Sequence, residues 1–271
     1  MIIHPFLTET ERIISKLQRI VSKKITTLQL NGSEFIPFMQ PICKSDTVIG
    51  CEVLLRVKKD GVYYGPEPYL PGLESSDAIN DVTCALLYKV INHFQAHPVA
   101  LPEGFYFSFN ICVKQLNSTK VIDAIRSFNK YFMGASVVLE IVERGTTDFD
   151  DFALDAMQLL VEEGVRFSID DFGSGSSGLK YIELTGFTTI KIDKCLTVMN
   201  KGSLVYSMVI DAIMAISYKL NMQVIAEGVE SKEQLSLLKE KGIHCFQGYF
   251  FSRPIHINCF CGKYLNGDRY N

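Results

Sequence analysis

The chain has 271 residues, of which 47% are hydrophobic and 21% charged, and its formal net charge is −3. A sequence pI near 6.0 argues against a general nucleic-acid-coating surface, so we predict no DNA partner. The hydrophobic content is enough for one large core. The length suits a single α/β barrel, a class of domain that commonly has about 250 residues.

The positions of the cysteines and the hydropathy of the sequence predict the cellular compartment of the protein. None of the eight cysteines belongs to a CxxC pair, and most lie inside apolar runs, which is typical of small core residues in a reducing cytoplasm. An alternative is a zinc site of Cys259 and Cys261 with His244 and His256, although this spacing fits no usual zinc finger. No apolar stretch reaches the roughly eighteen residues of a membrane span, and the N-terminus has no signal-peptide pattern. We therefore expect a cytoplasmic protein without a membrane span.

The first predicted element is an amphipathic helix near residues 10–25, where apolar residues recur at helical spacing. We assign residues 1–30 to this lead segment and residues 31–271 to the barrel domain. Two strands follow, at 35–43 and 48–57. Their connection is too short for a parallel crossover, so they must be antiparallel neighbours. One strand of the barrel is therefore expected to run against the others.

Helices and strands alternate after this hairpin. The predicted strands lie at 105–111, 137–142, 165–171, 188–193, 223–227 and 243–251. The predicted helices lie at 77–97, 114–132, 151–163, 203–219 and 231–241, with a short, poorly defined helix between the strands at 165 and 188. Six strands plus the hairpin predict an α/β fold, a modified (β/α)8 TIM-type barrel with one antiparallel strand at the start.

Polar residues end these extended runs. They are Glu52, Asn110, Glu140, Asp170 with Asp171, Lys191 with Asp193, Glu227 and Gln247. Since the strand ends of a barrel converge, these side chains are expected to share one mouth. Carboxylates this close repel one another unless cations neutralise them. Oxygen ligands with an amide favour Mg²⁺ or Mn²⁺ over Zn²⁺.

The adjacent acids Asp170 and Asp171 set a geometric condition. In a continuing strand their side chains would point to opposite faces, so both can serve one site only where the strand ends. The glycines at 173 and 175 are expected to supply that ending. The alternative is a solvated Asp-Asp turn without a function.

Seven motifs occur in a fixed order. They are Glu52-Val-Leu-Leu-Arg56, Phe109-Asn110 with Gln115-Leu116, Glu140-Ile-Val-Glu143, Asp170-Asp171-Phe-Gly-Ser-Gly175, Ile190-Lys191-Ile-Asp193, Ala226-Glu227-Gly-Val-Glu230 and Gln247-Gly-Tyr-Phe-Phe-Ser-Arg-Pro254. With them the chain resembles the EAL domain family of bacterial cyclic-di-GMP phosphodiesterases, from about residue 35 to 256. The resemblance implies hydrolysis of cyclic di-GMP to linear pGpG with two Mg²⁺ or Mn²⁺ ions, and inhibition by Ca²⁺.

The resemblance also implies a role for each matched residue. The implied metal ligands are Glu52, Asn110, Glu140, Asp170, Asp171 and Glu227. The implied catalytic residues are Lys191, Glu227 and Glu52, with Lys191 orienting or deprotonating the attacking water or offsetting phosphate charge. The implied substrate-binding residues are Arg56, Leu54, Asp193, Gln247 and Pro254. Glu143, Gly173, Gly175 and Glu230 are implied loop or supporting residues, and the 172–180 loop region is implied to form a homodimer contact.

Other functions remain open. A catalytically inactive EAL domain would act as a cyclic-di-GMP receptor or protein-interaction module, and its signature would be a lost metal ligand, which this sequence does not show. A barrel glycosidase explains fewer of the acids and gives Lys191 and Arg56 no role. A cyclase or a His-Asp phosphodiesterase is disfavoured, because the sequence has no GGDEF-like run and no His followed by Asp.

Overall fold

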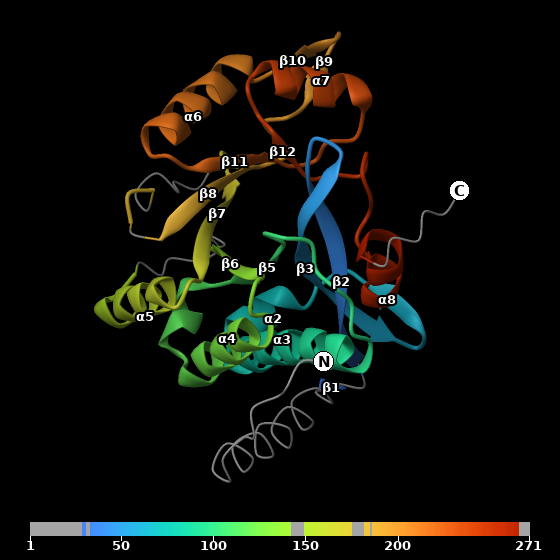
Figure 1. Cartoon of the computed structure of the whole chain (residues 1–271), viewed down its shortest axis with the longest axis vertical. Coiled ribbons are helices and arrows are strands. Elements are labelled where there is room, and N and C mark those ends of the chain that lie inside the picture. The colour runs from blue at the N-terminus through green and yellow to red at the C-terminus, as the bar shows by residue number, and fades with distance from the viewer. Residues whose placement is uncertain (1–28, 31–32, 142–148, 175–181, 185, 266–271) are drawn as a thin grey trace, which may run out of the picture.

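The computed structural model describes residues 29–30, 33–141, 149–174, 182–184 and 186–265, and eight of its strands close into a barrel (Figure 1). Around the ring the strands are β2 (Ser33–Lys44), β12 (Cys245–Phe246), β11 (Gln223–Ala226), β8 (Phe187–Ile192), β7 (Arg166–Phe172), β6 (Ser136–Ile141), β5 (Tyr106–Ile111) and β3 (Thr47–Lys59), which pairs again with β2. The predicted modified (β/α)8 barrel is confirmed.

Strand β2 runs against the rest of the ring. It pairs antiparallel with β3 and with β12, whereas the other neighbouring pairs are parallel. The tight turn between β2 and β3 contains Ser45 with a φ of 54°. The prediction of one reversed strand is thus confirmed, because a two-residue connection cannot span a parallel crossover.

The longer helices of the described chain lie outside the strands (Figure 1). They are α3 (Ala78–Ala96), α4 (Thr119–Tyr131), α5 (Asp151–Glu162), α6 (Ser207–Lys219) and α7 (Lys232–Glu240). Side-chain caps start two of them: Asp150 accepts from the backbone N–H of Ala153, and Ser231 accepts from that of Gln234. Among the described helices, none combines the length and the apolar character needed to cross a membrane.

Three predicted boundaries were wrong. The predicted helix 114–132 is a 3-10 turn, η1 (Val113–Asn117), followed by α4, because Ser118 between them is extended. The predicted helix 203–219 begins as a small hairpin of β9 (Met199–Asn200) and β10 (Ser203–Leu204), and α6 starts only at Ser207. The predicted strand 243–251 is limited to β12, since the chain turns after Gln247.

Short elements around the ring had no clear sequence signal. They are β1 (Gln29–Leu30), β4 (Val62–Tyr64), α2 (Leu70–Glu74), β13 (Ile255–His256), α8 (Ile257–Phe260) and the π-helical turn η3 (Cys261–Leu265). The predicted lead helix falls in residues that lie outside the described part of the chain. So does most of the predicted short helix between β7 and β8.

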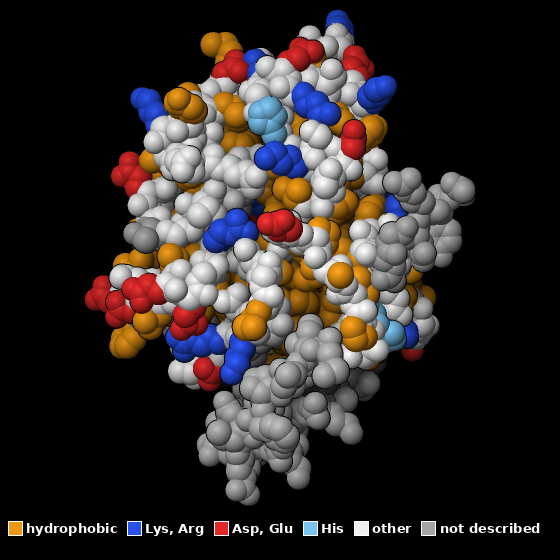
Figure 2. All heavy atoms as spheres, viewed as in Figure 1, with side chains coloured by type: hydrophobic (Ala, Val, Ile, Leu, Met, Phe, Trp, Pro, Cys, Tyr) orange, Lys and Arg blue, Asp and Glu red, His pale blue; other side chains and the backbone are white. Residues whose placement is uncertain are grey.

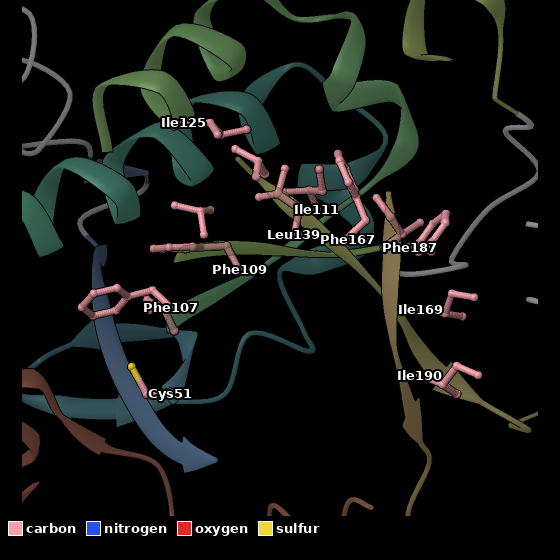
Figure 3. Close-up of a cluster of buried hydrophobic side chains, with 14 of the residues drawn as sticks. Cys51, Phe107, Phe109, Ile111, Ile125, Leu139, Phe167, Ile169, Phe187 and Ile190 are labelled. Carbon is pink, nitrogen blue, oxygen red and sulfur yellow. The ribbon is translucent and has the colours of Figure 1, made fainter. Parts of the chain in front are cut away.

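Alternation along the strands separates the core from the site. On β5, Phe107 and Phe109 face the helices and form edge-to-face contacts with Phe128 of α4. Figure 3 shows these two phenylalanines in the apolar layer between strands and helices. Asn110, one residue after Phe109, points the other way and bonds to Glu52 inside the barrel. The barrel interior therefore carries the polar residues.

The charged side chains on the drawn face do not indicate where a functional site lies. On the face drawn in Figure 2, Lys and Arg side chains are interspersed with Asp and Glu side chains. No continuous basic surface forms on that face.

Gly50 of β3 tests the packing of the ring. A Cβ at this position would lie 2.7 Å from the carbonyl oxygen of Tyr106 and 2.8 Å from its ring. We expect Gly50→Ala to lower the free energy of unfolding by about 1–3 kcal/mol, because backbone and a buried ring must both shift. Chemical denaturation measures this loss.

Gly72→Ala is the matched control. Gly72 lies in α2, and a Cβ there meets no atom within 4 Å. This variant should keep or slightly raise stability, because Ala favours the helix by up to about 1 kcal/mol. Equal stability of the two variants would contradict the close packing of Gly50 against Tyr106.

Candidate metal and substrate site

The polar strand residues meet around one buried ammonium group. Lys191 Nζ lies 2.6 Å from Glu140, 2.7 Å from Glu227, 3.0 Å from Asp170 and 3.4 Å from Glu52. The side chains of Lys191 and Glu140 are each 1% exposed. Four strands and the residue after β11 thus bring one positive and four acidic side chains together, as the sequence predicted.

The site's electrostatics follow from burial and crowding. Burial raises the pKa of Glu140 well above its ordinary value, the charge of Glu52 adds to this, and Lys191 opposes it. Burial likewise raises the pKa of Glu227 to about 8, although Lys191 opposes the change. For Lys191, burial alone would lower the pKa, but the four carboxylates raise it well above its ordinary value. The ammonium is therefore held in its charged form.

Glu52 is the carboxyl group with the most donors. Burial alone would raise its pKa, but Lys191 and hydrogen bonds from Gln247 and Asn110 lower it below the ordinary value. Asn110 Nδ2 donates to Glu52 Oε1 at 2.6 Å, and Gln247 Nε2 donates to Glu52 Oε2 at 2.6 Å. Lys191 and two amides therefore hold Glu52 as an anion.

Sequence reasoning missed Gln40, which completes this network. Gln247 Nε2 also donates to Gln40 Oε1 at 3.2 Å, and Gln40 is only 8% exposed on β2. In register, Gln40 lies directly opposite Glu52. The available signal was an amide between Met39 and Pro41 in an otherwise apolar strand.

A backbone irregularity brings Asp170 and Asp171 to one site. Strand β7 continues through Phe172, so the strand does not end at the Asp pair as predicted. Instead, Asp171 has a φ of 51°, and the pairing with β8 shifts register between Ile169 and Phe172. This left-handed residue breaks the alternation that would otherwise separate the two carboxylates.

The donor set fits divalent cations. Carboxylate oxygens of Asp170, Asp171 and Glu227 lie within 4.8 Å of one another. In the described part of the chain, Gln247 Oε1 is a buried oxygen that accepts no hydrogen bond, and Asp170 Oδ1 has the Lys191 ammonium 3.0 Å away as its neighbour. Carboxylate and amide oxygens are the ligands of Mg²⁺ and Mn²⁺. Buried acceptors left without donors are suited to bind a cation.

No zinc site appears at the cysteines. Within the described ranges, the acidic group above is the one set of three or more His, Cys, Asp or Glu residues close enough to hold an ion. Cys259 is exposed and Cys261 is buried. The side chains of this CxC pair thus lie in different environments.

We call the carboxyl side chains of Glu52, Glu140, Asp170, Asp171 and Glu227 the acidic ring. A cavity of about 390 Å³ is lined by several of them. Its walls include Leu54 and Arg56 of the predicted substrate-binding set, and Gln247. Asp193 and Pro254 do not line it, and Asp193 instead accepts from the backbone N–H of Cys195 at 2.8 Å. Helices α2 and α3 line the cavity mainly with apolar residues, Leu70, Ile79, Val82 and Leu86, together with Glu74 and Thr83.

Arg56 lies at the cavity wall. Its Nη1 donates to the carbonyl of Leu55 at 2.7 Å, and its guanidinium lies 5.8 Å from the Phe38 ring centroid.

The predicted supporting residues have different surroundings. Glu230 lines the cavity, and its backbone N–H donates to Gln234. Gly173 has a φ of 96°, and a Cβ there would lie 2.3 Å from Leu196, so only glycine fits this turn. Glu143, Gly175 and most of the predicted 172–180 dimer loop lie outside the described residues.

Comparisons with known proteins agree with this geometry. The sequence model of the EAL domain matches residues 23–254. The probable cyclic di-GMP phosphodiesterase PdeG of Escherichia coli (strain K12) is 32% identical over 238 residues, which cover 86% of this chain and 47% of PdeG. The cyclic di-GMP phosphodiesterase PdeL of the same strain is 29% identical, over 91% of this chain and 69% of PdeL. The chain thus spans about half the length of PdeG.

A solved structure shares the fold. The PaMucR phosphodiesterase in complex with c-di-GMP aligns with a TM-score of 0.70 and 24% identity, covering 83% of this chain and 99% of that one.

Metal binding should release protons. Because the pKa of Glu227 is about 8, this group is largely protonated near pH 7 without metal. A bound cation requires the carboxylate forms, so Mn²⁺ affinity should rise with pH until the pH exceeds about 8. Calorimetry in buffers of different ionisation enthalpy measures the released protons, and identical apparent enthalpies in all buffers would refute this expectation.

Lys191→Met should destabilise the metal-free protein. It removes the cation from among four acidic groups, which we expect to cost about 3 kcal/mol at neutral pH. The loss should shrink as the pH falls, since protonated carboxyl groups do not repel. Lys120→Met, which breaks an exposed pair with Asp81, should cost less than about 1 kcal/mol. Denaturation curves showing equal losses would contradict the central role of Lys191.

Proposed function

Because the chain belongs to the EAL domain family, we propose that it hydrolyses cyclic di-GMP to linear pGpG with two Mg²⁺ or Mn²⁺ ions. The observation that carries the proposal is the convergence of Glu52, Glu140, Asp170 and Glu227 on one buried point beneath a cavity. The names of PdeG and PdeL supply the substrate class.

The metal ligands we propose are drawn from the acidic ring. Glu52, Asn110, Glu140 and Asp170 would hold one ion, and Asp170 would be shared with a second ion held by Asp171 and Glu227. A pair of ions of this kind acidifies a bound water and stabilises charge on phosphorus during in-line attack. The close approach of Asp170, Asp171 and Glu227 supports this assignment.

Lys191 is proposed to act as a fixed positive charge. Its ammonium reaches four of the ring carboxylates, so it can orient a water molecule held among them and offset negative charge on the phosphate. The raised pKa of Lys191 disfavours the alternative in which it removes a proton from the water.

Substrate binding is proposed for the rest of the cavity. The phosphates would lie over the acidic ring, with Arg56 contacting the far phosphate through its planar donors. A flat base would lie against the apolar residues that line the cavity, Leu54 and Leu86 among them.

Purified protein incubated with cyclic di-GMP and Mg²⁺ or Mn²⁺ tests the proposal, with products resolved by chromatography. We expect pGpG from the unaltered protein and at least about a 100-fold lower rate from Glu52→Ala, because a direct ligand matters more than an outer-shell group. Glu103→Ala, which changes an exposed acid outside the cavity, should keep the rate. Ligand binding without any pGpG would favour the receptor function instead.

Calcium should inhibit the reaction. Ca²⁺ is larger than Mg²⁺ and accepts looser coordination, so it would occupy the ligands without holding water and phosphate for in-line attack. Rates measured at fixed Mg²⁺ with increasing Ca²⁺ should therefore fall. Equal rates with either ion alone would argue against a site that is sensitive to metal geometry.

A further inference from the structure

Gln40 links two parts of the chain that border the cavity. Its Nε2 donates to the backbone carbonyl of Ser252 at 3.0 Å, and its Oε1 accepts from Gln247 Nε2 at 3.2 Å. Both side chains are buried, with Gln40 8% and Gln247 4% exposed. The same Gln247 Nε2 donates to Glu52 at 2.6 Å. The result is a continuous chain of hydrogen bonds from a backbone carbonyl to a predicted metal ligand.

This chain of bonds has a single direction. A backbone carbonyl can only accept, so Ser252 requires the amide nitrogen of Gln40 to face it. The Gln40 oxygen then faces Gln247 and can only accept in turn. A flipped Gln247 amide would place its oxygen against two other acceptors, Gln40 Oε1 and the Glu52 carboxylate. The bond to the Ser252 carbonyl therefore sets the orientation of the Gln40 amide, and the Gln40 oxygen in turn sets the orientation of the Gln247 amide.

The backbone of Gln247 is fixed independently of Gln40. Its N–H donates to the carbonyl of Ala226 at 2.9 Å, and its carbonyl accepts from Val229 at 3.1 Å. A Cβ on Gly248 would lie 2.1 Å from the carbonyl oxygen of Val229, so the next residue is packed directly on that backbone. The side-chain amide is thus the part of Gln247 whose orientation Gln40 determines.

In that orientation Gln247 Oε1 is an acceptor that is available to bind a ligand. Within the described part of the chain it has no hydrogen-bond partner, although it is buried and Gln247 lines the cavity. A buried carbonyl oxygen without a donor is costly unless something binds it. A divalent cation, or a water molecule on that cation, has the chemistry to do so.

We propose that Gln40 is a positioning residue for metal binding: it fixes the Gln247 amide so that Oε1 faces the divalent cation. The proposal rests on the proposed function only in taking the acidic ring to be a metal site. Gln40 also lines the cavity, and the role proposed here acts through its bond to Gln247. Orienting groups of this kind commonly change metal affinity by about 10–100-fold.

Direct Mn²⁺ binding, measured by electron paramagnetic resonance without cyclic di-GMP, tests the proposal. Gln40→Met keeps the side-chain length but removes both hydrogen bonds, and we expect about 10-fold weaker Mn²⁺ binding. At saturating Mn²⁺ the rate of hydrolysis should fall less than the affinity. Gln40→Glu keeps an acceptor for Gln247 Nε2, so its Mn²⁺ affinity should equal or exceed that of the unaltered protein. This second variant also serves if Gln40→Met fails to fold.

A double-mutant cycle shows whether Gln40 acts through Gln247. In a Gln247→Met background, adding Gln40→Met should weaken Mn²⁺ binding by less than about 2-fold, because the oriented group is already gone. Additive losses would overturn the proposal. So would unchanged affinity in Gln40→Met, or a protein that binds no Mn²⁺ at all.

Gln115→Met is the matched control for losing a buried amide. Gln115 is 1% exposed and bonds to Thr83 and to the backbone of Cys112, outside the acidic ring. Its Mn²⁺ affinity should stay within about 2-fold of the unaltered value, and a loss equal to that of Gln40→Met would count against a specific role. Mn²⁺ binding that responds to Gln40→Met in a protein that leaves cyclic di-GMP intact would support this inference while removing the proposed hydrolysis.

Discussion

The ammonium of Lys191, buried among four carboxyl groups, is the interaction on which the interior of the barrel depends. Burying a charge costs several kcal/mol unless partners surround it. Here the partners come from β3, β6, β7 and from the residue after β11, so they meet only when the ring has closed. Charge balance at this point and closure of the sheet are therefore coupled.

The same crowding that needs Lys191 prepares the site for other cations. Burial raises the pKa of Glu140 and Glu227, while Lys191 and two amides hold Glu52 below its ordinary pKa. Metal binding requires the carboxylate forms, so the raised pKa values couple it to proton release. The unpartnered oxygen of Gln247 adds an acceptor that protein side chains do not satisfy.

The cavity lining combines two chemically different kinds of residue. Its lining includes members of the acidic ring and apolar residues of α2 and α3. The substrate that we propose carries both phosphates and flat bases, which suits such a mixed lining. The antiparallel strand β2 contributes to the polar lining through Gln40, so the irregular start of the barrel also serves the site.

The sequence by itself determined the barrel, its reversed strand and most of the polar side chains that meet inside the barrel. Short connections and apolar periodicity depend on local geometry, and the acids follow apolar strands at readable positions. Only the tertiary structure decided how Asp170 and Asp171 share a face, because a left-handed residue inside β7 has no reliable sequence signal. It alone also revealed Gln40, whose role arises from contacts with residues 207 and 212 positions away along the chain. Such pairings depend on ring closure, which local sequence does not encode.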